Sequence, residues 1–283
     1  MIHLLSLLLL LLAYPIIVSS YTILGGLDEA KSSSEPKDAV TETLRHFSPP
    51  RQVKLRTQSH ESSGRVSMAG TLWEASPLLA DYITNPACPL EAFQRMRISE
   101  NDVQPQPSKP STVVELGSGI GLASLAAAFL GCRVYATDGS PSSIRLLQGN
   151  FERYANDCPI APHASMLEWG DANAADAIIH NHLQKLPDIV MASDVVYAHS
   201  AREELSQTVR QLCPRGHING RVLVAHRWRA NPVDEEAFFQ SFDDEFDREE
   251  VGIEYFPNDE YYRTRSFIDM KYPISIFEMR RKW

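Results

Sequence analysis

The chain has 283 residues, of which 43% are hydrophobic and 22% are charged, so fibrous, collagen-like and wholly disordered proteins are excluded. Lys and Arg number 27 against 36 Asp and Glu, which gives a formal net charge of −9. Because nucleic-acid phosphates are bound by clustered basic side chains, this balance argues against direct nucleic-acid binding. No metal site is expected either, since no CxxC pair or zinc-type spacing occurs among Cys88, Cys132, Cys158 and Cys213.

The N-terminal segment is not expected to belong to the folded domain. Residues 2–18 are almost entirely apolar and include a run of six leucines, and small residues follow at 18–20, as at the cleavage site of a secretory signal. We predict a signal peptide or membrane anchor over 1–20, and a location in the secretory pathway or a membrane-bounded organelle. A cytoplasmic protein with a mis-assigned start is the alternative, because no Lys or Arg precedes the run. The polar, Ser-rich stretch that follows predicts a flexible linker over 21–45.

The next part of the chain predicts a strand, a helix and a loop. Arg51–Gln58 alternates apolar and polar residues, which favours a half-exposed strand, with 64–68 as its hairpin partner. Leu72–Ile83 predicts a helix that must hold Pro77 in its first turn. Residues 85–110 are rich in Pro, Gln and Ser and predict a surface excursion.

From Ser111 onward, short apolar runs alternate with segments of helical periodicity. The predicted strands are Thr112–Leu116, Arg133–Thr137, Ala164–Trp169, Asp188–Ala192 and Arg221–Ala225. Helix-start signals support three of the helices between or after them: Ser140-Pro141, a capping box of Ser200 with Glu203, and Asn231-Pro232. Two strands without an intervening helix close the chain, at Glu250–Phe256 and Ile274–Met279. This order predicts an α/β fold, a mostly parallel sheet with helices on both faces and a C-terminal β-hairpin.

A glycine-rich turn, VVELGSGIG, follows the first of these strands over 113–121. Glycines at a strand-to-helix turn let the backbone approach a ligand, and the helix N-terminus offers free amides. The strict dinucleotide pattern GxGxxG fails because Leu122 stands at its last position, and a P-loop would need a Gly-Lys-Ser/Thr sequence that is absent. Asp138 ends the next strand, where a carboxylate can accept both hydroxyls of a ribose. Capping the following helix is the alternative role for this side chain.

ELGSGIG, followed by ATD, resembles motif I and its partner acid in the class I, seven-β-strand, S-adenosylmethionine-dependent methyltransferases. GTLWEAS around Trp73, LEWGD around Trp169 and ASDVVY at 192–197 resemble the protein-lysine methyltransferase branch with an Asp-x-x-Tyr motif. The resemblance covers the chain from about Arg51 to its end, within an expected methyltransferase domain over 46–283. It implies a Rossmann-like seven-stranded sheet with the last hairpin reversed, and S-adenosyl-L-methionine as cofactor.

The resemblance also implies roles for individual residues. Asp194 and Tyr197 are the predicted catalytic residues, a carboxylate that can hold the acceptor ammonium and an aromatic face that lines its channel. The alternative is that Asp194 caps a loop and Tyr197 is core. Glu115 would hold the turn and the charged amino end of the cofactor, or merely brace the loop. The other predicted cofactor-binding residues are Trp73, Gly117, Ser118, Gly119, Gly121, Asp138, Trp169 and Ser193, although both tryptophans could be plain core.

The function predicted from this resemblance is N-methyl transfer to a protein, with lysine side chains as the expected acceptor. Direct displacement at a sulfonium methyl requires positioning and electrostatics rather than a metal or a covalent nucleophile. A small-molecule methyltransferase and a non-enzymatic module that kept the fold are the alternatives, because fold alone does not determine activity. We expect a monomer that meets a protein substrate and contacts a membrane only through an uncleaved N-terminal segment.

Overall fold

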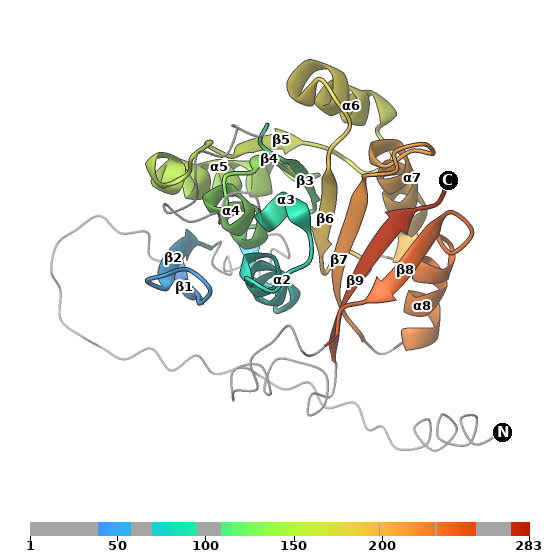
Figure 1. The fold of residues 1–283 in the computed structure, drawn as a ribbon, viewed down its shortest axis with the longest axis horizontal. Coiled ribbons are helices and arrows are strands. Elements are labelled where there is room, and N and C mark those ends of the chain that lie inside the picture. The colour runs from blue at the N-terminus through green and yellow to red at the C-terminus, as the bar shows by residue number, and fades with distance from the viewer. Residues whose placement is uncertain (1–38, 58–69, 95–108, 198, 230, 253–272) are drawn as a thin grey trace, which may run out of the picture. The chain divides into compact units, whose positions relative to one another are not determined.

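The structure is a computed structural model, and it describes residues 39–57, 70–94, 109–197, 199–229, 231–252 and 273–283. These residues form a seven-stranded sheet with helices on both faces, together with a separate two-stranded sheet (Figure 1). The predicted signal or anchor at 1–20 and the predicted strand at 64–68 lie outside the described residues. Within the described ranges, no helix combines the length and the apolar character needed to cross a membrane.

The large sheet has the strand order β5-β4-β3-β6-β7-β9-β8. Its parallel part consists of β3 (Thr112–Leu116), β4 (Arg133–Asp138), β5 (His163–Met166), β6 (Ile189–Ser193) and β7 (Arg221–Arg227). The last strand, β9 (Ile274–Arg281), lies between β7 and β8 (Phe246–Glu250) and runs antiparallel to both. The predicted α/β fold with a reversed C-terminal hairpin is therefore confirmed.

Each face of this sheet is buried under helices, and successive strand residues belong to opposite cores. Val113 lies in the core formed with α2 (Ala75–Thr84), α4 (Leu122–Phe129) and α5 (Pro141–Tyr154). Val114 lies in the core formed with α6 (Ala172–Ala177), α7 (Arg202–Leu212) and α8 (Pro232–Gln240). Because both faces are covered, the strands carry apolar residues on both faces rather than alternating apolar and polar ones, and this pattern made them recognisable.

The two-stranded sheet corrects one expectation for the N-terminal region. β1 (Ala39–Leu44) pairs antiparallel with β2 (Arg51–Arg56), so part of the predicted linker over 21–45 is a strand. The described partner of β2 is β1, and the partner predicted at 64–68 lies outside the described residues. Burial of Leu44, Val53 and Leu55 in the α2–α4–α5 core supports the pairing, and the polar local sequence does not reveal that burial.

The segment after α2 is not a surface excursion throughout. Cys88, Leu90 and Phe93 are buried in the first core, and Phe93 lies on a short helix, α3 (Glu91–Gln94). The abundance of Pro and Gln in this segment concealed the three apolar anchors. The later part, 95–108, lies outside the described residues.

Two further boundaries differ from the prediction. The turn η4 (His199–Ala201) runs directly into α7, and no described side chain caps that helix, so Ser200 and Glu203 do not form the predicted capping box. The strand expected at 250–256 overlaps β8 (Phe246–Glu250) only at Glu250, and residues 253–256 lie outside the described residues. The earlier start brings in Phe246, which is buried with its ring centroid 5.7 Å from that of Phe242.

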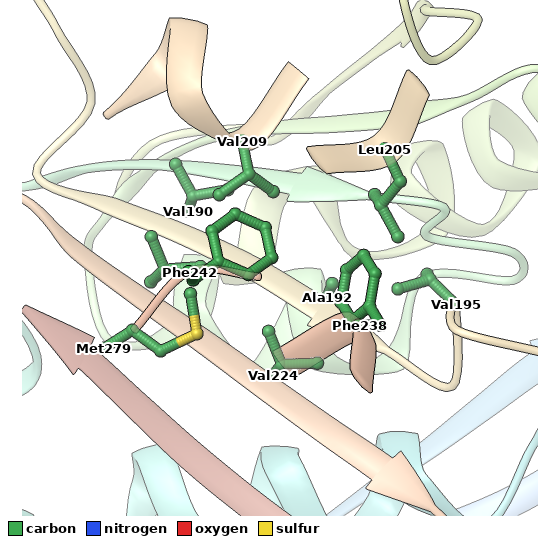
Figure 2. A pocket seen from close by; sticks show the side chains of 10 residues that line it. Val190, Ala192, Val195, Leu205, Val209, Val224, Phe238, Phe242 and Met279 are labelled. Atoms are coloured by element: carbon green, nitrogen blue, oxygen red, sulfur yellow. The ribbon is translucent and has the colours of Figure 1, made fainter. Parts of the chain in front are cut away.

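A small gap lies in the second core between the sheet and helices α7 and α8 (Figure 2). Its volume is about 10 Å³, and the rings of Phe238 and Phe242 face it. Every described side chain that lines the gap is apolar, so a water molecule would find no side-chain hydrogen-bond partner there. The gap is therefore a packing feature rather than a ligand site.

Candidate functional site

A cavity of about 490 Å³ lies where β3, β4, β5 and β6 reach their carboxyl ends, the edge at which open α/β sheets bind ligands. Eight of the eleven predicted site residues line it, drawn from four different strand ends and from the segment before α2. They are Trp73, Gly117, Gly119, Asp138, Trp169, Ser193, Asp194 and Tyr197. The tertiary structure thus brings the separate sequence motifs to one place.

The glycine turn owes its shape to left-handed backbone angles. Gly117, Gly119 and Gly121 have φ values of +64°, +53° and +86°, a region that side-chain-bearing residues rarely adopt. A Cβ atom at Gly117 would lie 2.8 Å from Val195 Cγ1 and 3.2 Å from Trp169 Cζ2, and both of these residues line the cavity. Glycine at this position therefore allows the turn and keeps the cavity wall from being crowded.

Asp138 ties the glycine turn to the start of α5. Its Oδ2 accepts a hydrogen bond from the Gly119 amide at 3.2 Å, and its Oδ1 accepts one from the Ser140 amide at 3.0 Å. The Ser140 hydroxyl bonds to that of Ser142 at 2.7 Å instead of to the helix backbone. Each carboxylate oxygen of Asp138 keeps capacity for a second donor, so bracing the loop and accepting a ribose hydroxyl are compatible.

Three predicted cofactor-binding residues are absent from the described cavity lining: Glu115, Ser118 and Gly121. The Ser118 hydroxyl donates to the Glu115 carbonyl and accepts from the Thr137 amide, which fastens the turn to β4. Gly121 precedes the first turn of α4. The geometry places these residues behind the wall as supports, and their predicted contact with the cofactor stays a prediction.

Glu115 is fully buried on β3. Ser124 on α4 donates a short hydrogen bond to its Oε2, whereas no described residue bonds to its Oε1. Burial raises the pKa of Glu115 to about 7, because a desolvated carboxylate is disfavoured relative to the neutral acid. This side chain therefore supports the turn from within the core and changes charge near neutral pH.

The two tryptophans lie on the cavity wall and are half-buried. Trp73 precedes α2, and Trp169 follows β5 and also packs against the second core. Trp169 is therefore both a core residue and a cavity residue, so the two predicted alternatives apply together. Flat aromatic surfaces of this kind suit a nucleobase or another planar group.

Asp194 is the most constrained residue of the cavity. It follows β6 with a φ of +59°, and its amide donates to the Ala225 carbonyl at 2.8 Å. Its side chain is fully buried, with Oδ2 paired to Arg229 Nη2 at 2.6 Å. None of the described groups bonds to Oδ1. A strained residue with a half-satisfied buried carboxylate on a cavity wall is typical of a functional site.

Tyr197 lies at the open edge of the cavity, where 44% of the residue is exposed. The Arg229 guanidinium carbon lies 6.0 Å from the centroid of its ring. Partial burial, assisted by the carboxylates of Asp138 and Asp194, raises the pKa of Tyr197. The phenol therefore stays neutral at physiological pH and presents an aromatic surface to whatever enters.

Three charged residues of the site were missed in the sequence. Glu168 adjoins Trp169 in the LEWGD motif, so the motif itself could have indicated it. Glu204 on α7 and Arg229 after β7 carry no local signal, because only the fold brings Glu204 to the cavity lining and Arg229 to Asp194. With Asp138 and Asp194, the lining includes four carboxylates, a wall that attracts cations.

Metal chemistry has no evident basis in the described parts of the chain. These parts contain no group of three or more His, Cys, Asp or Glu side chains able to hold a metal ion. All four cysteines are free and buried. Burial raises the pKa of Cys132 to about 12, so this thiol is a poor nucleophile.

Comparison with known proteins identifies relatives of the chain. A family described as lysine methyltransferase matches residues 52–245. The protein-lysine methyltransferase METTL21E of Mus musculus is 38% identical over 141 residues, which is 50% of this chain and 54% of that protein. The human methyltransferase-like protein 21E pseudogene is 30% identical over 227 residues, covering 80% and 78% of the two chains. The chain spans about half the length of the mouse and bovine METTL21E proteins that it matches.

Among solved structures, a magnesium protoporphyrin IX methyltransferase from Synechocystis aligns with a TM-score of 0.45 and 16% identity, over 78% of this chain and 87% of that one. The family match is the stronger finding, since it covers more than half of the chain. All residues that line the cavity, from Trp73 to Glu204, lie within the matched range. The chain therefore belongs to the lysine methyltransferase family.

Proposed function

We propose that this protein transfers a methyl group from S-adenosyl-L-methionine to the side-chain amine of a lysine in a protein substrate. The observation that carries the proposal is a single cavity with two distinct walls. One wall is the glycine turn with Asp138, and the other is the segment from Asp194 to Tyr197. The relatives named as protein-lysine methyltransferases support the same reaction.

The residues present fit such a cofactor. The glycine turn brings backbone close to the cavity, Asp138 has acceptor capacity for ribose hydroxyls, and Trp73 and Trp169 offer aromatic faces. The unpaired Oδ1 of Asp194 marks the place where a further hydrogen-bond donor is expected. When bound, the cofactor would supply an electrophilic methyl group on a sulfonium sulfur.

The chain contributes binding, orientation and exclusion of water. Asp194 would accept a hydrogen bond from the incoming amine through Oδ1, and Tyr197 would line its path. The amine held at Asp194 would form the new nitrogen–carbon bond as the carbon–sulfur bond breaks, with S-adenosylhomocysteine as the leaving group and the amine proton passing to solvent. Holding the reacting atoms in line is the main source of acceleration in such a displacement.

A protein acceptor is favoured over a small enclosed substrate by the position of Tyr197. This residue is 44% exposed at the cavity edge, so the acceptor side opens to the surface. A lysine side chain is long enough to reach into such an opening while its backbone stays outside. An enclosed pocket would be needed to surround a small molecule.

The test combines binding with transfer. Titration calorimetry on residues 37–283 should show binding of S-adenosylmethionine and S-adenosylhomocysteine and none of NAD. Incubation of the same protein with a cell extract and radiolabelled cofactor should label a protein band, and acid hydrolysis should release methyl-lysine. Binding of NAD without the sulfonium ligand, or label only in small molecules, would overturn the proposal.

We further propose that residues 1–20 direct the protein to the secretory pathway or a membrane-bounded organelle, and that the protein acts as a monomer without binding nucleic acid. The apolar leucine run followed by small residues supports the proposed location. The net charge of −9 supports the proposed absence of nucleic-acid binding. Imaging of C-terminally tagged protein and mass spectrometry of its N-terminus test the location, and a cytosolic protein with an intact N-terminus would refute it. Light scattering tests the monomer.

A further inference from the structure

Arg229 is held in place from several sides. Its Nη2 pairs with Asp194 Oδ2 at 2.6 Å, and its Nη1 donates to the Arg227 carbonyl at 3.1 Å. Its backbone amide donates to Glu235 Oε2 at 2.9 Å. The Arg229 side chain is 30% exposed, whereas the side chain of its partner Asp194, which lines the cavity, is fully buried. The arginine is therefore pre-organised toward a single carboxylate.

Glu235 is itself fixed by a buried partner. Its Oε2 also lies 3.1 Å from His226 Nε2, and His226 is fully buried on β7. Burial lowers the pKa of His226, so the imidazole is neutral and uses its Nε2–H to donate to Glu235. This arrangement anchors the segment after β7 and determines where the guanidinium of Arg229 lies.

The pairing changes the charge that a ligand meets. An unpaired Asp194 carboxylate would favour a protonated amine, yet methyl transfer requires the neutral amine as nucleophile. With Arg229 on Oδ2, the pair has no net charge, and Oδ1 remains an acceptor for one N–H group. Besides Asp194, the charged residues that line the cavity are Asp138, Glu168 and Glu204, all carboxylates, so the charge of Arg229 on Asp194 opposes their preference for a cation.

Resting on the proposed function, we propose that Arg229 is a positioning residue that neutralises Asp194 and thereby sets the acceptor site to receive an uncharged amine. The Asp194 amide bond to Ala225 holds the carboxylate near the cavity independently of Arg229. Loss of the arginine should therefore strengthen binding of an ammonium group while slowing transfer. A purely structural role would weaken both.

The probe is sinefungin, a cofactor analogue that carries a primary ammonium group in place of the sulfonium methyl. Its affinity relative to S-adenosylhomocysteine, which lacks that group, reports the charge of the acceptor site. Calorimetry on the full domain should show that Arg229→Met raises this ratio about 10-fold, because one compensating charge a few ångströms away is lost. S-adenosylhomocysteine affinity should stay within about 3-fold, since no contact to it is removed.

A charge cycle makes the test specific. Asp194→Asn should lower the ratio of sinefungin affinity to S-adenosylhomocysteine affinity about 10-fold, because Arg229 is left unpaired. In the double variant, with Asp194→Asn and Arg229→Met, this ratio should return to within about 3-fold of its value in the unmodified protein. Arg229→Lys keeps the charge and should leave the ratio nearly unchanged. Arg280→Met removes a guanidinium that pairs with Glu249 at 2.6 Å on the outer strands, and it serves as the matched control.

The outcomes separate this inference from the proposed function. Absence of S-adenosylhomocysteine binding to the unmodified protein would refute the function itself. The role of Arg229 would be refuted if Arg229→Met still binds both ligands with an unchanged affinity ratio. It would also be refuted if a folded Arg229→Met variant loses affinity for sinefungin and S-adenosylhomocysteine equally. A change in Arg229→Lys as large as in Arg229→Met would also refute it.

Discussion

The two walls of the cavity are built in different ways. The cofactor wall is centred on one stretch of chain, residues 117–140, in which glycines and backbone amides bonded to Asp138 set the shape, and Trp73 and Trp169 add aromatic faces. The acceptor wall combines Asp194 and Tyr197 with Arg229, which is held by Glu235, so it depends on side-chain charges from two separate strand ends. A wall built from backbone is disrupted by added side-chain volume. A wall built from paired charges is disrupted when one member of an ion pair is removed.

The largest effect is expected on the acceptor wall. Asp194→Ala should reduce methyl transfer about 1,000-fold, because it removes the acceptor for the amine and leaves Arg229 without its partner. Cofactor affinity should stay within a few-fold, since the other wall is untouched. Single-turnover transfer and calorimetry on the same preparation measure the two quantities. Equal loss of both would show that the walls are not independent.

The support behind the cofactor wall should be disrupted by added side-chain volume alone. Gly121→Ala places a Cβ 2.4 Å from Leu147 Cδ1 and 2.9 Å from Phe151 Cε1, at a φ of +86°, and should lower the free energy of unfolding by about 3 kcal/mol. Gly216 has a φ of +84° with no atom within 4 Å of the added carbon. Gly216→Ala should therefore cost only about 1 kcal/mol. Equal losses in denaturant unfolding would mean that backbone strain, not crowding, dominates.

Substitution of Asp138 tests whether this side chain binds the cofactor in addition to bracing the glycine turn. Asp138→Ala should weaken S-adenosylmethionine binding by about 1–3 kcal/mol, because two charge-assisted hydrogen bonds to a ribose are lost. Asp138→Asn keeps one carbonyl acceptor and should lose less. Calorimetry gives both values, and circular dichroism checks the fold. Unchanged affinity in both variants would restrict Asp138 to bracing the turn through the Gly119 amide.

The smallest effect concerns the buried acid behind the cofactor wall. Because burial raises the pKa of Glu115 from its ordinary value of 4.5 to about 7 in the folded state, the folded state keeps a proton that the unfolded state releases between these values. Stability is therefore lost as pH rises, by about 1–2 kcal/mol between pH 5 and 7. Glu115→Gln should remove this slope in denaturant unfolding.

Glu245→Gln is the control for that slope. A hydrogen bond from Arg210 lowers the pKa of Glu245, so this carboxyl titrates below the same pH window and its loss should leave the slope unchanged. Persistence of the full slope in Glu115→Gln would show that other groups cause it.

Much of the fold was predictable because burial on both faces leaves a simple pattern. The five parallel strands and their order of appearance follow from apolar runs separated by helical periodicity, and the reversed hairpin follows from two strands in succession. The pairing of β1 with β2 and the burial of Phe93 were not predictable. Their stability comes from packing against helices far away in sequence.

The sequence by itself determined the glycine turn and the acid that ends the next strand, because both act through backbone geometry within one strand–helix–strand unit. Asp194 and Tyr197 were likewise visible as a short motif. Only the tertiary structure decided that Arg229 pairs with Asp194, across 35 positions of sequence, and that Glu115 lies behind the cavity wall. Charges interact through space rather than along the chain, so the electrostatic character of the acceptor wall emerges only when β6 and β7 lie side by side.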